Sequence, residues 1–183
     1  MVLDYGCGSG ILSLASLGLG ASKVVGVDIE AEALLTADAN MKMNGYDVND
    51  SEDGLERYEL FHTREIEPYC LTLSSTGAVD VCVANILIGQ LVRSSMVSAL
   101  LTNIRPGGWI CLSGIRPWEV EALKTAYGTY VDWCDEHYGE LDAKNTEGSL
   151  ESYGFDVGLW ARVVGKVKTV GINVEALSEM AVM

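Results

Sequence analysis

The sequence predicts an α/β domain with a mostly parallel sheet, because short apolar strands alternate with helical segments along the chain. The first observation is segment 1–10, an apolar run that stops at Asp4 and then breaks into glycines at alternate positions. The second is the β-branched run 23–29, which closes on an acid. The third is segment 78–85, whose apolar character is typical of a central strand with both faces covered.

Three glycines, Gly6, Gly8 and Gly10, predict a ligand-binding turn after the first strand. A glycine takes positive φ easily and has no Cβ, so the main chain can lie directly against a bound molecule. In the dinucleotide fingerprint G-x-G-x-x-G the third glycine would fall at position 11, which is Ile11 here. Asp4 would repel a pyrophosphate but could pair with a cationic amino group, so an NAD-linked oxidoreductase is disfavoured.

Asp28 ends the second strand, eighteen residues after Gly10. A carboxylate at this place in a βαβ unit hydrogen-bonds a ribose diol, and we therefore predict that Asp28 is a ribose ligand. The alternative is that Asp28 or Glu30 only caps the helix that follows.

Asn85 ends the apolar strand 78–85 and opens the segment N-I-L-I. In open α/β sheets the ligand lies beyond the carboxyl ends of the strands, so Asn85 would face the same crevice as Gly8 and Asp28. An amide oxygen can accept a hydrogen bond from an amine and hold its lone pair toward a methyl donor, as amino-group methylation requires. The alternative is that Asn85 is a strand-end turn residue.

The remaining elements follow the same alternation of apolar periodicity and turn residues. We expect helices at 11–17, 30–44, 90–103 and from Pro117 to Tyr127. We expect further strands at 58–62 and 109–113 and a closing antiparallel hairpin of 130–138 with 158–168. Polar or glycine-bearing stretches predict loops at 46–57, 63–78 and 139–154.

Length and charge limit the classes of function. With 183 residues, 49% of them hydrophobic, the chain suffices for one well-buried α/β domain. Its 12 Lys and Arg against 26 Asp and Glu give a net charge of −14, which would repel a nucleic-acid backbone. Direct nucleic-acid binding is disfavoured and a basic protein partner is favoured; the alternative is that the acidity serves only solubility.

Cysteine and histidine usage predicts neither a metal site nor a disulfide framework. The five cysteines include no C-x-x-C pair, and the two histidines fall in separate segments. Reduced cysteines fit the cytoplasm, with an organelle left open. No apolar stretch reaches the roughly 20 residues of a membrane span, and the N-terminus does not resemble a signal peptide.

Taken together, these motifs resemble the PrmA family, S-adenosylmethionine-dependent methyltransferases of a protein of the large ribosomal subunit. The resemblance covers roughly residues 1–168, predicted as one methyltransferase domain, and leaves 169–183 as a tail without an assigned role. It rests on four segments: V-L-D-Y-G-C-G-S-G-I-L at 2–12, G-V-D-I-E at 26–30, V-A-N-I-L at 83–87 and P-G-G-W-I-C-L-S-G-I at 106–115.

The resemblance implies a Rossmann-like class I methyltransferase fold, with a seven-stranded, mostly parallel sheet and a C-terminal antiparallel hairpin. It implies transfer of methyl groups to lysine ε-amino and N-terminal α-amino groups. Asn85 would orient the amine, and the backbone at Ile86 and Leu87 would line its slot. The cofactor-binding residues it implies are Asp4, Gly6, Cys7, Gly8, Ser9, Gly10, Asp28, Ile29 and Asn85.

Two departures from the family leave other functions open. Family members carry an N-terminal substrate-recognition domain, which we expect to be absent here because the chain opens in the first strand. The acidic segment 139–154 has no counterpart with a family role. The alternatives are methylation of another protein lysine or a small amine, or a catalytically silent module that binds S-adenosylmethionine. The oligomeric state is not predicted.

Overall fold

A computed structural model describes the chain over residues 1–46, 57–63, 79–142 and 158–168. Most of the three predicted loops lies outside these ranges, as does the whole tail 169–183. No helix in the described ranges is both long and apolar enough to cross a bilayer.

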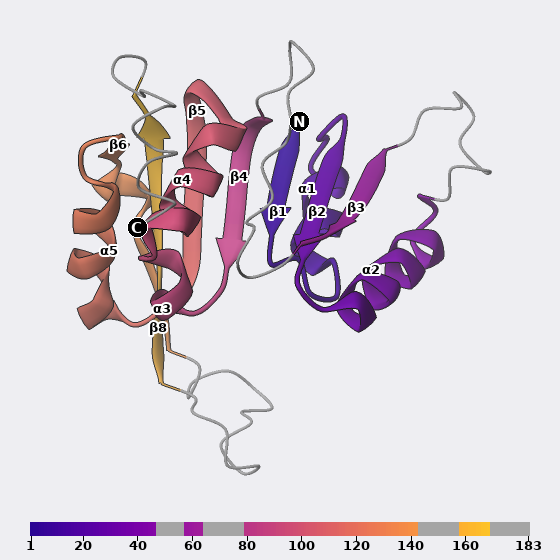
Figure 1. The fold of residues 1–183 in the computed structure, drawn as a ribbon. Coiled ribbons are helices and arrows are strands. Elements are labelled where there is room, and N and C mark those ends of the chain that lie inside the picture. Colours follow the sequence, from indigo (N-terminus) through magenta and orange to yellow (C-terminus); the bar gives the residue numbers. More distant parts are fainter. Residues whose placement is uncertain (47–56, 64–78, 143–157, 169–183) are drawn as a thin grey trace.

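Eight strands form one sheet (Figure 1). In chain order they are β1 (Val2–Tyr5), β2 (Val24–Asp28), β3 (Tyr58–His62), β4 (Val79–Asn85), β5 (Ile104–Ile115), β6 (Val131–Trp133), β7 (Gly139–Asp142) and β8 (Leu159–Val167). Seven of them follow one another across the sheet in the order β3-β2-β1-β4-β5-β8-β6, and β7 pairs with β8 beside this path.

The strand directions confirm the predicted mostly parallel sheet. β1 pairs parallel with β2 and β4, and the parallel pairing continues to β3 on one side and β5 on the other. β8 runs antiparallel to β5, β6 and β7. On the seven-strand path, β8 is therefore the one strand that opposes the other six, and the C-terminal strands are antiparallel as predicted.

The bounds of the C-terminal strands differ from the prediction. The strand expected at 130–138 is only Val131–Trp133, and a short 3-10 turn follows it at Asp135–His137. Residues 139–142, expected in a loop, form β7 against the first half of β8. β6 and β7 thus share β8 as a partner, which a single predicted hairpin did not anticipate.

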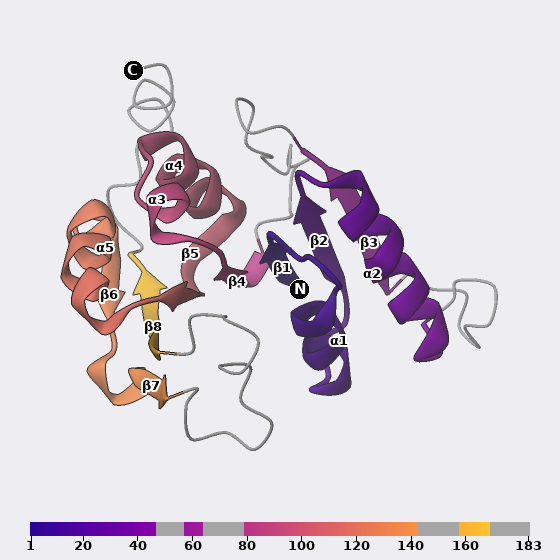
Figure 2. The ribbon, with the colours of Figure 1, turned by 90° about the horizontal axis from the view of Figure 1, so that it is seen from below.

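Helices cover both faces of the sheet. They are α1 (Ile11–Gly18), α2 (Ala31–Met43), α3 (Ile88–Leu91), α4 (Ser94–Asn103) and α5 (Val120–Tyr127). Figure 2 shows α1 and α4 on opposite faces. The single helix expected at 90–103 is wrong, because Arg93 takes an extended conformation, φ −65° and ψ 134°, between α3 and α4. Two serines follow it, and serine favours such helix starts over helix interiors.

The main core lies beneath α4 and α5. Leu3, Leu100, Ile110 and Tyr127 are fully buried in it, and each such side chain stabilises the fold by about 1.5–3 kcal/mol. The Tyr127 hydroxyl donates to the carbonyl of Leu91 at 2.9 Å, which fixes α5 against the end of α3. The core therefore holds rigidly the strands whose carboxyl ends carry the site.

Candidate functional site

Asp28, Gly6 and Asn85 lie side by side at one edge of the sheet. β1 lies between β2 and β4, and Tyr5 pairs both with the residue before Asp28 and with the residue before Asn85. Neighbouring strands are about 4.8 Å apart, so the backbones of Asp28 and Asn85 are separated by about 10 Å across Gly6. Both strand ends share one edge, as expected.

The glycine loop adopts the conformation that its sequence predicts. Gly6, Gly8 and Gly10 have φ of 76°, 53° and 79°. A Cβ on Gly6 would lie 2.4 Å from Cγ2 of Ile86, whereas a Cβ on Gly8 would meet nothing within 4 Å. Gly6 thus permits close packing of the loop on the β4 end, while the space beyond Gly8 is open to a ligand.

Asp28 joins this loop to the end of β2. Its Oδ2 accepts a hydrogen bond from the backbone N–H of Gly8 at 2.8 Å, and its Oδ1 accepts one from the N–H of Glu30 at 3.0 Å. Each oxygen retains a further lone pair, because a carboxylate has about four acceptor positions. Asp28 therefore closes a turn just before α2, whose N-cap Glu30 makes no side-chain cap hydrogen bond, and it can still accept hydrogen bonds from a diol.

Asp4 is fully buried beneath the loop. Its Oδ2 accepts a hydrogen bond from Ser13 Oγ at 2.6 Å, while its Oδ1 has no hydrogen-bond partner among the described residues. Burial raises the pKa of Asp4 to about 6, opposed by the Ser13 hydrogen bonds and assisted by the charge of Asp28. An unpartnered buried carboxylate oxygen is costly, and a nearby cation would offset that cost.

Cys7 and Ser9 fix the shape of the loop. The N–H groups of Gly6 and Cys7 donate to the carbonyl of Val27 at 2.7 and 3.0 Å. Burial raises the pKa of the Cys7 thiol to about 12, so the thiol is neutral and unreactive. The carbonyl of Ser9 accepts from Asn40 Nδ2 at 2.8 Å, which ties the loop to α2.

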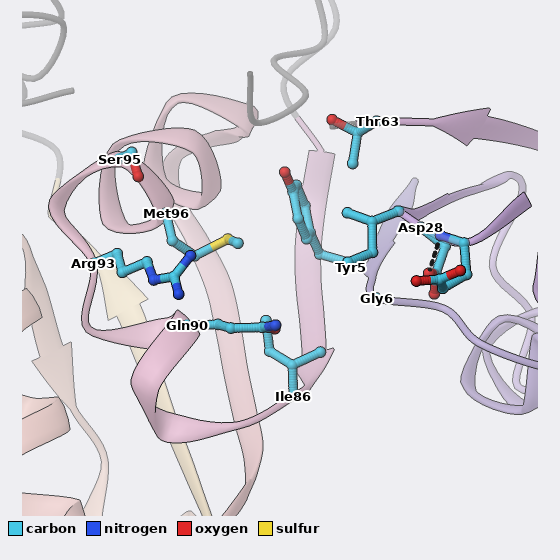
Figure 3. Close-up of a pocket in the computed structure, with 11 residues that line it drawn as sticks. Tyr5, Gly6, Asp28, Thr63, Ile86, Gln90, Arg93, Ser95 and Met96 are labelled. Carbon is cyan, nitrogen blue, oxygen red and sulfur yellow. Dashed lines mark hydrogen bonds between the residues drawn. The ribbon is translucent and has the colours of Figure 1, made fainter. Parts of the chain in front are cut away.

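A first hollow of about 260 Å³ opens beside Asp28 and Gly6 (Figure 3). Tyr5 lies in its middle, between Thr63 on one side and Met96 on the other. Four of the predicted site residues line this first hollow: Gly6, Asp28, Ile29 and Ile86. Its other lining residues are Tyr5, Glu30, Thr63, Gln90, Arg93, Ser95 and Met96.

A second hollow of about 610 Å³ lies on the other side of Ile86 and contains Asn85. Asn85 and Asp28 thus line neighbouring hollows at the same edge of the sheet, and the role expected of Asn85 stays a prediction. Ile86, the first residue after β4, lines the first hollow with its side chain against Gly6, while its backbone lies against Gly114 of the second hollow. The lining residues of the second hollow are Asn85, Ser113, Gly114, Gly139, Glu140, Leu141, Trp160, Ala161 and Arg162.

Gly114 fixes the place of Asn85. It has a φ of 78°, and a Cβ there would lie 2.5 Å from Asn85 Oδ1 and 3.1 Å from the carbonyl oxygen of Ile86. The last residues of β5 thus abut the end of β4. Leu87, predicted to line the amine slot, is 67% exposed and is not among the lining residues of either hollow.

Sequence reasoning missed several lining residues for different reasons. Thr63 directly follows β3, so the rule that ligands bind at carboxyl strand ends would have found it. Gly114 lies within the recognised segment 106–115. Glu140 carried no such signal, because its place depends on the pairing of β7 with β8. In the described ranges, no three His, Cys, Asp or Glu side chains gather as ligands for a metal ion.

The fold and the site together define a class of protein. A parallel sheet with one antiparallel strand near its end, a glycine loop tied to an acid on the next strand, and a polar residue closing β4 are the features of a class I methyltransferase. Residues 1–137 match the family model of ribosomal protein L11 methyltransferase (PrmA). The chain belongs to this family.

Known relatives agree with this assignment. The chain is 40% identical over 132 residues to ribosomal protein L11 methyltransferase of Cellvibrio japonicus, covering 72% of this chain and 39% of that protein. It is 38% identical over 134 residues to that of Colwellia psychrerythraea, covering 73% and 39%. The matched stretch is thus about two fifths of the length of these relatives.

A solved structure shows the same fold. Ribosomal protein L11 methylase from Lactobacillus delbrueckii subsp. bulgaricus matches with a TM-score of 0.62 at 24% identity, covering 91% of this chain and 69% of that one.

Proposed function

We propose that this chain binds S-adenosylmethionine and transfers its methyl group to lysine ε-amino and N-terminal α-amino groups of a protein of the large ribosomal subunit. Membership of the PrmA family supports a methyltransferase. The observation that carries the proposal is the row of Asp28, Gly6 and Asn85 at one sheet edge, with a hollow on each side of Ile86.

The first hollow suits the methyl donor. Asp28 would accept hydrogen bonds from the ribose hydroxyls, and Ile29, 42% exposed beside it, would lie against the adenine. The backbone of the loop from Gly6 to Gly10 would lie against the methionine portion, with Cys7 and Ser9 holding the loop in shape. The unpartnered oxygen of Asp4 supports a cationic amino group above it.

The second hollow suits the methyl acceptor. When bound, the sulfonium supplies an electrophilic methyl group. Asn85 would accept a hydrogen bond from the uncharged amine and direct its lone pair past Ile86 toward that methyl group, with the backbone at Leu87 beside it. The new C–N bond forms as the C–S bond breaks, and the amine proton leaves to water. Catalysis then comes mainly from positioning and loss of water, with no covalent enzyme intermediate.

The charge and the cysteines support the remaining parts of the proposal. A chain with a net charge of −14 favours a basic protein as substrate over direct contact with nucleic acid. The four cysteines of the described residues are free thiols, which supports a reducing compartment such as the cytoplasm.

Two measurements test the proposal. Calorimetry measures binding of S-adenosylmethionine, and radiolabel transfer to ribosomal protein L11 measures catalysis by the wild type and by Asn85→Ala. We expect binding by both proteins and transfer by the wild type alone. Binding without any transfer by the wild type would favour the silent module, and absence of binding would overturn the proposal.

A further inference from the structure

One wall of the second hollow carries a carboxylate, Glu140, to which the family assignment gives no role. β7 supplies it: Glu140 pairs with Ala161, and Leu141 with Trp160, on the first half of β8. β7 begins at Gly139, after the last residue that the family model matches, residue 137. This wall therefore lies outside the stretch that the family model matches.

The carboxylate of Glu140 is held in place from within the chain. The Tyr138 hydroxyl donates a hydrogen bond to its Oε1, and this bond raises the pKa of Tyr138 above its ordinary value. Arg162, the other charged lining residue, donates from Nη2 to the carbonyl of His137 at 3.3 Å. Glu140 thus offers a fixed negative charge to a molecule that enters the hollow.

The wall next to Glu140 is apolar and partly rigid. Leu141 is 58% exposed, and the indole of Trp160 lies under the guanidinium of Arg116, with Cζ 3.9 Å from the ring centroid. Arg116 Nη1 also donates to the carbonyl of Leu159 at 3.0 Å, which fixes this stack on β8. An apolar wall beside a carboxylate suits a long basic side chain, whose methylene stem packs while its charged end is paired.

We propose that the second hollow binds a basic peptide segment of the substrate protein, and that Glu140 is a specificity-determining residue that pairs with a cationic side chain next to the lysine to be methylated. The inference rests on the proposed function in so far as the lysine amine is taken to lie at Asn85. The net charge of −14 on the whole chain also attracts a basic peptide before it reaches the hollow.

Peptide binding to the full chain tests this inference without any methyl transfer. The probes are fluorescein-labelled alanine peptides with a central lysine, flanked two positions away on each side by arginine in one peptide and by glutamine in the other. Fluorescence anisotropy should show up to about fivefold tighter binding of the arginine peptide by the wild type, the upper end of the range for an exposed ion pair. Glu140→Gln should reduce this preference by more than the loss of one charge elsewhere on the chain does.

Two further variants separate charge from fold. Glu121→Gln, on an exposed part of α5, removes the same charge away from the hollow and should keep the preference. Tyr138→Phe leaves the charge of Glu140 but releases its side chain, and should reduce the preference partly. A wild type that binds both peptides equally, or a Glu140→Gln protein that prefers arginine as strongly as the Glu121→Gln protein does, would overturn the inference. If the wild type prefers the arginine peptide but transfers no methyl group, only the proposed function is contradicted.

Discussion

Asp28 and Asn85 lie at the same level of the sheet on either side of β1, yet they line different hollows. Ile86 lies between them and contacts the glycine loop at Gly6, where no Cβ could fit. In the proposed reaction, donor and acceptor approach from the two sides of this residue. Binding of the donor and transfer to the acceptor should therefore respond to different substitutions.

Asp28→Asn should weaken S-adenosylmethionine binding by about ten- to a hundredfold. The substitution removes the charge from hydrogen bonds to the ribose, each of which contributes about 1.5–3 kcal/mol. Calorimetry gives the dissociation constant. Glu32→Gln, an exposed acid in the first turn of α2, is the matched control and should bind as the wild type does. Equal affinity of Asp28→Asn and wild type would remove the ribose assignment.

Gly114→Ala should abolish methyl transfer while S-adenosylmethionine binding stays within about twofold of the wild type. The new Cβ would occupy the space of Asn85 Oδ1 and would sit at a φ of 78°, where a side chain costs about 1 kcal/mol or more. Gly18→Ala, whose Cβ would meet nothing within 4 Å, is the control. Radiolabel transfer and calorimetry on the same samples provide the comparison. Undiminished transfer by Gly114→Ala would show that Asn85 need not keep its place.

The parts of the site that could be predicted from the sequence depend on local conformation. The glycines at positions 6 and 8 predict the positive φ found there, and Asp28 is recognisable as the acid that ends a β-branched strand. The strand ending at Asn85 was predictable because its apolar run has turn residues at both ends. In each case residues within one short segment decide the conformation, so the segment alone carries the information.

The parts that could not be predicted depend on contacts between distant segments. Glu140 reaches the neighbourhood of Asn85 only because β7 pairs with β8 rather than continuing from β6. Likewise, Gln90 and Met96 line the first hollow because the chain breaks its helix at Arg93. Strand partners and helix breaks of this kind are decided by tertiary packing, which a single sequence shows only weakly.

Asp4→Asn should stabilise the protein at neutral pH. Because the pKa of buried Asp4 is raised from 3.8 to about 6, the folded state binds a proton more tightly than the unfolded state does. Proton binding by Asp4 therefore adds to the free energy of unfolding at low pH, and this contribution is lost as the pH rises from about 4 to about 6. Asparagine keeps an acceptor for Ser13 but has no charge to bury.

Urea unfolding measures this effect. The free energy of unfolding of Asp4→Asn, relative to the wild type, should increase by about 1 kcal/mol between pH 5 and pH 7.5, since one pKa unit corresponds to about 1.4 kcal/mol. Asp38→Asn is the contrast, because the half-buried Asp38 pairs with Lys42 and Tyr58 and has a lowered pKa. A difference that stays constant with pH would mean that Asp4 does not titrate in this range.

Binding of S-adenosylmethionine should strengthen as the pH rises through about 6 and then level off. If the amino group of the ligand pairs with the unpartnered oxygen of Asp4, it favours the ionised carboxylate, so binding below pH 6 must expel a proton. Calorimetry in two buffers of different ionisation enthalpy measures that proton release directly. Asp4→Asn should bind more weakly at pH 7.5 and lose the pH dependence between 5 and 7. A wild-type affinity that does not change across this range would show that the amino group is held by other residues, and that Asp4 acts only through Ser13 on the start of α1.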